Sequence, residues 1–168
     1  MFIFNCTIMK IYFLFLSLGF ALISFTCKKN LNGPYLPPHS LFFLIKKGGS
    51  RLPDSTLDNM KLYYYQNGIK TYLSDFGRAT EEGYNLGILT TRDIGLRSGN
   101  DNIKIFYLEY LYGQPDTLFA DYRHLSTNEA KQDPCYCYYP IQQVKFNGQV
   151  TSTDPSITQE PVYIFYKS

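Results

Sequence analysis

The segment KLYYYQNGIKTYL, residues 61–73, predicts a β-hairpin and thereby points to the fold class of the chain. Asn67 and Gly68 at its centre both tolerate positive φ, which a two-residue type I′ turn requires, and strand-forming residues flank them. Such a turn sets the register of the two strands. On one side of the sheet we expect the pairs Tyr63–Tyr72 and Tyr65–Lys70, and on the other the pairs Gln66–Ile69, Tyr64–Thr71 and Leu62–Leu73.

Further strand and turn signals follow the same pattern along the chain. A second hairpin is expected between residues 102–112 and 117–125, because Leu118, Ala120 and Tyr122 alternate with polar residues. Asn147-Gly148 marks another tight turn, after which Val150 starts a short returning strand. The weaker strand candidates are residues 41–46, 86–91, 141–146 and 161–167.

Helix signals are few. Ser126 and Glu129 have the spacing of a capping box, but Pro134 leaves room for only a turn or two. Glu81 and Glu82 are expected in a loop next to Gly83. Roughly seven to nine short strands separated by turns predict an all-β domain over residues 41–168, a small antiparallel β-sandwich of the immunoglobulin-like or transthyretin-like type.

The composition suits one folded domain. The chain has 168 residues, of which 45% are hydrophobic and 17% aromatic, so it has enough apolar surface to bury and is not expected to be disordered. It has 16 basic and 14 acidic residues. A nucleic-acid partner is therefore not expected, because a basic excess of two, with no basic stripe, is too small to replace the counterions of a phosphate backbone.

The N-terminal region has the three parts of a secretory signal. Residues 11–26, IYFLFLSLGFALISFT, carry no charge, Met9-Lys10 precedes them, and the polar residues from Cys27 onward follow. We expect translation to start at Met9, because residues 1–8 would otherwise bury the positive start within apolar sequence. Residues 1–26 are thus predicted to be a signal peptide with a hydrophobic helix.

The position of Cys27 directly after this apolar run, followed by Lys28, Lys29 and Asn30, resembles the lipobox of bacterial lipoproteins over residues 9–30. Ser24, Phe25 and Thr26 depart from the residues usual in that box. The resemblance implies cleavage before Cys27, diacylglycerol on its sulfur and a fatty acyl chain, such as palmitate, on its new amino group. It also implies sorting to the outer membrane, because Lys28 stands where an Asp retains some lipoproteins in the inner membrane.

Residues 27–40 would then form a lipidated cysteine and a Pro/Gly-rich tether that holds the domain clear of the lipid. The alternative is an uncleaved helical anchor. In that arrangement Lys28 and Lys29 would hold their flank, and the folded domain after it, inside the cell.

The other two cysteines of the mature chain are Cys135 and Cys137, in the segment DPCYCYYP of residues 133–140. An oxidising compartment favours a disulfide between them, which needs a local bend because two residues of an extended strand lie near the distance limit for that bond. The alternative is a soft metal ion held by both thiols with His124 or His39. A complete ligand set at diagnostic spacing is missing, so neither a metal nor a cofactor is predicted.

Tyrosine is the remaining unusual feature, with 16 residues and no tryptophan in the whole chain. Tyr63, Tyr65 and Tyr72 share one face of the predicted hairpin. Tyrosine suits contacts with proteins or sugars, and the alternative is a structural role in which these rings only cover the faces and edges of a β domain. We therefore expect a non-catalytic, lipid-anchored binding or structural module of the cell envelope, with an envelope protein or a glycan as partner. The alternative is a periplasmic redox protein, metal-binding protein or enzyme that uses Cys135, Cys137 and His124.

Overall fold

The computed structural model describes residues 40–79, 81–130, 139–154 and 161–168, all within a compact unit of residues 35–168. Cys27, His39, Cys135 and Cys137 lie outside these residues, as do the expected signal peptide and nearly all of the tether. None of the helices in the described ranges has the length and apolar character needed to cross a bilayer. The predictions of a signal peptide, a lipid anchor and a disulfide therefore stay predictions.

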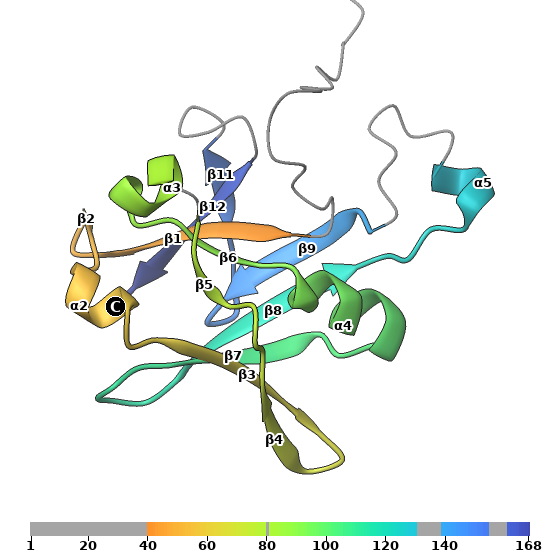
Figure 1. The fold of residues 1–168 in the computed structure, drawn as a ribbon, viewed down its shortest axis with the longest axis horizontal. Coiled ribbons are helices and arrows are strands. Elements are labelled where there is room, and N and C mark those ends of the chain that lie inside the picture. Colours follow the sequence, from red (N-terminus) through yellow and green to blue (C-terminus); the bar gives the residue numbers. More distant parts are fainter. Residues whose placement is uncertain (1–39, 80, 131–138, 155–160) are drawn as a thin grey trace, which may run out of the picture. The chain divides into compact units, whose positions relative to one another are not determined.

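The described domain is built from two six-stranded sheets, which confirms the all-β class (Figure 1). Sheet A has the order β11-β12-β1-β6-β5, with β2 paired to β1, and sheet B has the order β10-β9-β8-β7-β3-β4. The strands of sheet A are β1 (Leu41–Lys47), β2 (Ser50–Arg51), β5 (Gly77–Arg78), β6 (Leu89–Thr91), β11 (Ser152–Asp154) and β12 (Val162–Lys167). The strands of sheet B are β3 (Lys61–Gln66), β4 (Ile69–Tyr72), β7 (Ile105–Glu109), β8 (Asp116–Tyr122), β9 (Ile141–Phe146) and β10 (Gln149–Val150).

The β3–β4 hairpin has the register predicted from the sequence. Its turn residues Asn67 and Gly68 have φ values of 52° and 78°. The Leu73 N–H donates to the Leu62 carbonyl at 2.9 Å, which extends the pairing beyond the strand ends. The strand pairs are Tyr63–Tyr72, Tyr64–Thr71, Tyr65–Lys70 and Gln66–Ile69.

The second predicted hairpin is also present, as β7 and β8. Its inward residues Leu118, Ala120 and Tyr122 are buried, as their alternation predicted. The turn at Asn147-Gly148 joins β9 to the short β10, again as expected. The weak candidate at residues 86–91 is a strand only at its end, where β6 begins at Leu89.

One strand pair departs from the predicted antiparallel arrangement, because β1 and β12 are parallel, from Phe42–Val162 to Lys47–Lys167. All other described strand pairs are antiparallel. A parallel pair needs a long connection, and here almost the whole domain supplies it. Hydrophobic alternation identifies a strand but does not reveal which distant strand it will join.

In the described residues, four helices accompany the sheets: α2 (Asp54–Leu57), α3 (Glu81–Leu86), α4 (Asp93–Asp101) and α5 (Thr127–Ala130). The capping box of α5 is confirmed, because the Ser126 N–H donates to the Glu129 carboxylate at 3.0 Å and the Glu129 N–H donates back to the Ser126 hydroxyl. The expected loop at Glu81 and Glu82 is wrong, since both residues begin α3. The sequence gives no clear signal for α4, because its glycines, serine and asparagine favour a helix poorly.

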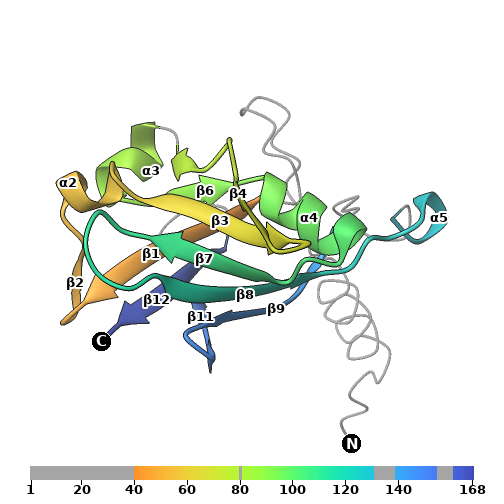
Figure 2. The ribbon, with the colours of Figure 1, turned by 90° about the horizontal axis from the view of Figure 1, so that it is seen from below.

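The main core lies between the two sheets. The ring of Phe165 on β12 stacks on Phe43 of β1 and on Phe146 of β9, with centroids 4.8 Å apart in both pairs, so it joins sheet A to sheet B. A second apolar cluster, which includes Leu44 and Ile164, covers the opposite face of sheet A. On the corresponding outer face of sheet B, the strands β3, β7 and β8 run side by side (Figure 2). The tyrosines that the hairpin was predicted to expose lie on this face.

Candidate functional site

The tyrosines predicted to share a face come together on the outer side of sheet B. Tyr63 and Tyr65 of β3 point away from the core because Leu62 and Tyr64 of the same strand point into it. The register of the hairpin adds Tyr72, and the pairing of β3 with β7 adds Tyr107. We call these four side chains, Tyr63, Tyr65, Tyr72 and Tyr107, the tyrosine face.

The rings of the tyrosine face support one another. Tyr63 stacks on Tyr107 with centroids 5.2 Å apart and an interplanar angle of 18°. Tyr65 meets the edges of both rings, at 5.7 Å from Tyr63 and 5.6 Å from Tyr107, and Tyr72 lies 5.7 Å from Tyr63. Each such aromatic pair contributes about 0.5–1.5 kcal/mol beyond its buried area. The rings are thus ordered before any partner arrives.

Exposure divides the tyrosine face into a base and a contact area. Tyr63 is only 5% exposed, whereas Tyr65 is 50% and Tyr72 is 46% exposed. Burial also raises the pKa of the Tyr63 hydroxyl. Tyr63 and the half-buried Tyr107 therefore form a platform, and Tyr65 and Tyr72 are the rings that a partner would touch.

An ion pair holds Tyr72 and the platform together. The Lys70 ammonium lies 2.6 Å from the Glu109 carboxylate and 4.0 Å from the centroid of the Tyr63 ring. The Tyr72 hydroxyl donates to the other carboxylate oxygen of Glu109 at 2.7 Å. Hydrogen bonds from Lys70 and then Tyr72 lower the pKa of Glu109, and the hydrogen bond to Glu109 raises the pKa of Lys70. Both groups stay charged at neutral pH.

The apolar surface continues beyond the tyrosine face toward the centre of sheet B. Ile105 of β7 is 50% exposed and lies opposite Phe119 of β8. The Lys145 ammonium of β9 lies 5.4 Å from the centroid of the Phe119 ring. A row of aromatic rings thus crosses the described strands β4, β3, β7 and β8. Lysine side chains lie over several of these rings, and the last lysine comes from β9.

The groups proposed for redox or metal chemistry are only partly described. His124 is exposed and its ring stacks on Tyr139 with centroids 4.8 Å apart. Gly99 of α4 leaves room for this stack, because a Cβ there would lie 2.8 Å from the Tyr139 ring. Within the described ranges, no group of three His, Cys, Asp or Glu residues is placed to hold a metal ion. The constellation of Cys135, Cys137 and His124 stays a prediction.

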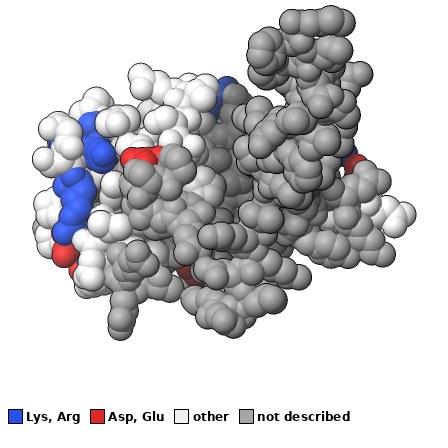
Figure 3. All heavy atoms as spheres, turned by 90° about the horizontal axis from the view of Figure 1, so that it is seen from above, with Lys and Arg blue, Asp and Glu red and all other residues white. Residues whose placement is uncertain are grey.

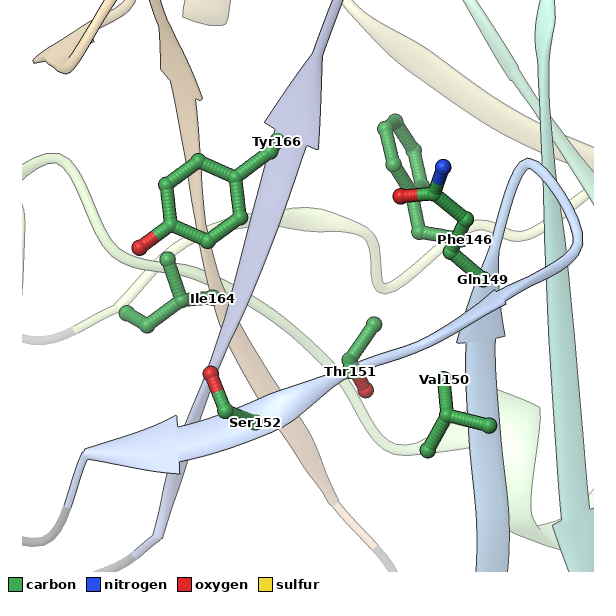
Figure 4. A pocket seen from close by; sticks show the side chains of 7 residues that line it. All are labelled: Phe146, Gln149, Val150, Thr151, Ser152, Ile164 and Tyr166. Atoms are coloured by element: carbon green, nitrogen blue, oxygen red, sulfur yellow. The ribbon is translucent and has the colours of Figure 1, made fainter.

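A small hollow lies where the chain passes from β10 of sheet B to β11 of sheet A (Figure 4). Its volume is about 120 Å³, which is below the roughly 300–1,000 Å³ of common small-molecule sites. Its lining includes no Asp, Glu, His, Cys, Lys or Arg. They are Phe146, Gln149, Val150, Thr151, Ser152, Ile164 and Tyr166. The hollow thus offers no acid, base or strong nucleophile.

A buried polar network lies at the start of β8, around Asp116. Its carboxylate accepts hydrogen bonds from the Tyr110 hydroxyl at 2.5 Å, the Lys167 ammonium at 2.6 Å and the Asn147 amide at 2.9 Å. Burial alone would raise the pKa of Asp116, but these hydrogen bonds outweigh it and lower the pKa. Burial raises the pKa of Tyr110. The network joins β12 to the β8–β9 region.

Most described charged side chains pair with one another. The clearest case is Arg78 of β5, whose 7%-exposed side chain lies 3.2 Å from Asp54 and 2.9 Å from Asp58 and so joins α2 to sheet A. On the face drawn in Figure 3, basic side chains gather on the side where β2 lies in Figure 1, with acidic ones beside them. The described ion pairs thus mainly connect neighbouring parts of the fold.

No protein-family model, curated protein or solved structure matches this chain. Among the described residues, the four rings of the tyrosine face contact one another, and two of them are about half exposed. Sequence reasoning found three of its members but missed Tyr107, because the pairing of β3 with β7 joins strands that are distant in the sequence.

Proposed function

We propose that this chain is a lipid-anchored envelope lipoprotein and that its β-domain is a non-catalytic module that binds a partner through the tyrosine face. The observation that carries the proposal is the pair of half-exposed rings, Tyr65 and Tyr72, held on an ordered base of tyrosines and one ion pair. Rigid tyrosines lose little conformational entropy on binding and offer both an apolar ring and a polar tip.

The open area of the two rings is large enough to matter for binding. A tyrosine buries about 150–250 Å² in full, so the exposed halves of Tyr65 and Tyr72 leave about 100 Å² each. At about 25 cal/mol per Å², covering both would contribute up to about 5 kcal/mol before the costs of association. The partner we propose is an envelope protein or a glycan.

The proposal places the domain at the outer membrane, tied to it through Cys27 and held off the lipid by residues 27–40. The charge-free run of residues 11–26 followed by Cys27 supports this location. We further propose that the two sheets form a sandwich of the immunoglobulin-like or transthyretin-like type. The shared core around Phe165 supports a sandwich, whereas the parallel β1–β12 pair distinguishes this domain from a purely antiparallel one.

The contact surface is tested by the double substitution Tyr65→Ser/Tyr72→Ser in the full chain, expressed in the bacterium that carries it. The matched control is Tyr112→Ser, which changes a tyrosine that is 85% exposed and lies outside the tyrosine face. We expect the double variant to lose envelope components that co-purify with the wild type and with the control. Equal recovery from all three proteins would reject the tyrosine face as the contact surface.

The anchor is tested separately with Cys27→Ala. We expect loss of the acyl mass and accumulation of the uncleaved precursor, both measured by intact-mass spectrometry. The lipoprotein proposal would be rejected if the wild-type protein carried no fatty adduct and if Cys27→Ala did not change how the chain is processed.

The second candidate is a redox or metal function of Cys135, Cys137 and His124. The observation in its favour is that Tyr139, two residues after Cys137, stacks on His124. Thiol titration before and after reduction, together with metal analysis of freshly purified protein, distinguishes the two candidates. Two free thiols and no metal in the untreated protein would reject this candidate.

A further inference from the structure

Strand β4 is the longest edge strand in the described part of the two sheets. It ends sheet B with four residues, whereas the other edge strands are shorter: β2, β5 and β10 have two residues each and β11 has three. Figure 1 shows the β3–β4 hairpin projecting beyond the neighbouring strands. Such an edge presents unpaired backbone groups that another strand can use.

The hairpin register shows which backbone groups of β4 face outward. The Leu73 N–H donates to the Leu62 carbonyl, so Leu62–Leu73 is a hydrogen-bonded pair. Hydrogen-bonded and non-hydrogen-bonded pairs alternate along an antiparallel ladder, so Tyr64–Thr71 is also hydrogen-bonded. The N–H and C=O groups of Lys70 and Tyr72 therefore point away from β3. No described residue hydrogen-bonds to these four backbone groups.

The usual protections of an edge strand are weak at β4. Proteins block edges with proline, with bulges or with charges that project past the edge. The strand has no proline, and its pairing with β3 is free of register shifts. Its one charge, on Lys70, is folded back over the sheet, 2.6 Å from Glu109 and 4.0 Å from the Tyr63 ring centroid. The edge is thus ordered and electrostatically balanced.

We propose that β4 pairs with β4 of a second copy of this chain, antiparallel, about a two-fold axis that passes between the two Thr71 residues. In this register Lys70 lies opposite Tyr72 of the second copy, and Tyr72 lies opposite its Lys70. All the outward N–H and C=O groups of both residues are then satisfied, in four backbone hydrogen bonds. An isologous contact of this kind closes after two copies.

Charge selects this register over its nearest alternative. Shifting the axis to Lys70 would place two lysines directly opposite each other, and like charges in that position destabilise a strand pair. With the axis at Thr71, each lysine instead meets a tyrosine ring, a contact of the kind that Lys70 already makes with Tyr63 and Tyr72 within one copy. The outer faces of the two sheets B then form one continuous surface.

The interface is small, which predicts weak and reversible pairing. One strand pair of four residues buries less than the roughly 1,200 Å² of a standard stable interface. Confinement of the chains to one surface would raise their effective concentration. The inference itself depends only on β4 and holds whether or not the chain is lipid-anchored.

A disulfide cross-link at the proposed axis tests the register. In the proposed dimer the two Thr71 residues form a non-hydrogen-bonded pair with Cα atoms about 4.5 Å apart, which is within the range for a disulfide. The matched control is Ile69→Cys, because Ile69 would face Leu73 and the two copies of residue 69 would lie about 13 Å apart along the strands. Both changes are made in the full chain with all four native cysteines, Cys6, Cys27, Cys135 and Cys137, replaced by serine, so that no other thiol can form the bridge.

We expect mild oxidation to convert Thr71→Cys into a disulfide dimer with at least a tenfold higher yield than Ile69→Cys at the same concentration. Mass spectrometry should identify the bridge between two tryptic peptides of residues 71–78. Equal yields from the two variants, or a bridge through another peptide, would overturn the proposal.

A second measurement uses the hydrogen-bonded positions, in case residue 71 does not tolerate cysteine. A mixture of Lys70→Cys and Tyr72→Cys proteins should form a heterodimer, because paired Cα atoms there lie about 5.5 Å apart. Each protein alone should form far less dimer, since the like residues are offset by two positions along the strands. No excess of the heterodimer, with circular dichroism confirming that both variants are folded, would also refute the pairing.

Discussion

Replacing Asp116 by alanine should destabilise the domain by about 3 kcal/mol. The substitution would leave the Lys167 ammonium, the Tyr110 hydroxyl and the Asn147 amide without their acceptor. The side chains of Asp116 and Lys167 are only 12% and 22% exposed. Removing one partner of a buried ion pair costs about 3–5 kcal/mol, and the remaining solvent access favours the low end.

Urea unfolding followed by circular dichroism measures this loss. In a domain of this size about 3 kcal/mol corresponds to a fall in the melting temperature of about 6–12 °C. Lys167→Met should cost about 1–2 kcal/mol, because Asp116 keeps its other two hydrogen bonds. The double variant should cost at least about 0.5 kcal/mol less than the two single losses together.

The control is Asp121→Ala on the same strand. Its ion pair with Lys104 is more exposed, at 27% and 37%, so this change should cost less than about 1 kcal/mol. If Asp116→Ala were no more destabilising than Asp121→Ala, or if the losses at Asp116 and Lys167 were additive, the network around Asp116 would not support the fold as argued.

The same carboxylate predicts a pH dependence of the free energy of unfolding. Its pKa is lowered in the folded state relative to its ordinary value of 3.8, so the unfolded chain binds the proton more readily. Asp116 therefore contributes stability above that value, and the contribution is lost as the pH falls through the lower pKa of the folded state. Asp116→Asn should flatten the fall in stability measured below about pH 4. An unchanged acid slope would contradict the assignment.

Three further substitutions test other parts of the fold in the same unfolding assay. Ser98→Ala should cost about 2 kcal/mol, because the buried Ser98 hydroxyl donates to the Ala120 carbonyl and accepts from the Tyr122 N–H; a loss below about 0.5 kcal/mol would show that these backbone groups do not need it. Gly68→Ala should cost about 1 kcal/mol because its φ is 78°, since no atom crowds the added Cβ. The control Gly77→Ala is equally uncrowded and should cost less. Equal losses would contradict the turn geometry. Phe165→Ala should cost about 3–5 kcal/mol, and a much smaller value would mean that its two ring stacks do not join the sheets.

The features that sequence reasoning predicted correctly are local. Asn67-Gly68 and Asn147-Gly148 specify tight turns, and a two-residue turn determines the facing pairs on both sides of it. The spacing of Ser126 and Glu129 likewise predicts a capping box within four residues of chain. Helix α4 was missed because its residues favour a helix poorly; contacts such as those of Ile94 with the core stabilise it instead.

The grouping of Tyr63, Tyr65 and Tyr72 on one face followed from the sequence alone, because a turn and strict alternation determine it. Three contacts came only from the tertiary structure. They are the stack of Tyr107 on Tyr63, the ion pair of Lys167 with Asp116 and the parallel pairing of β1 with β12. These contacts connect residues far apart in the chain. Their formation depends on which strands bury the most apolar surface together, and a local pattern contains no information about that choice.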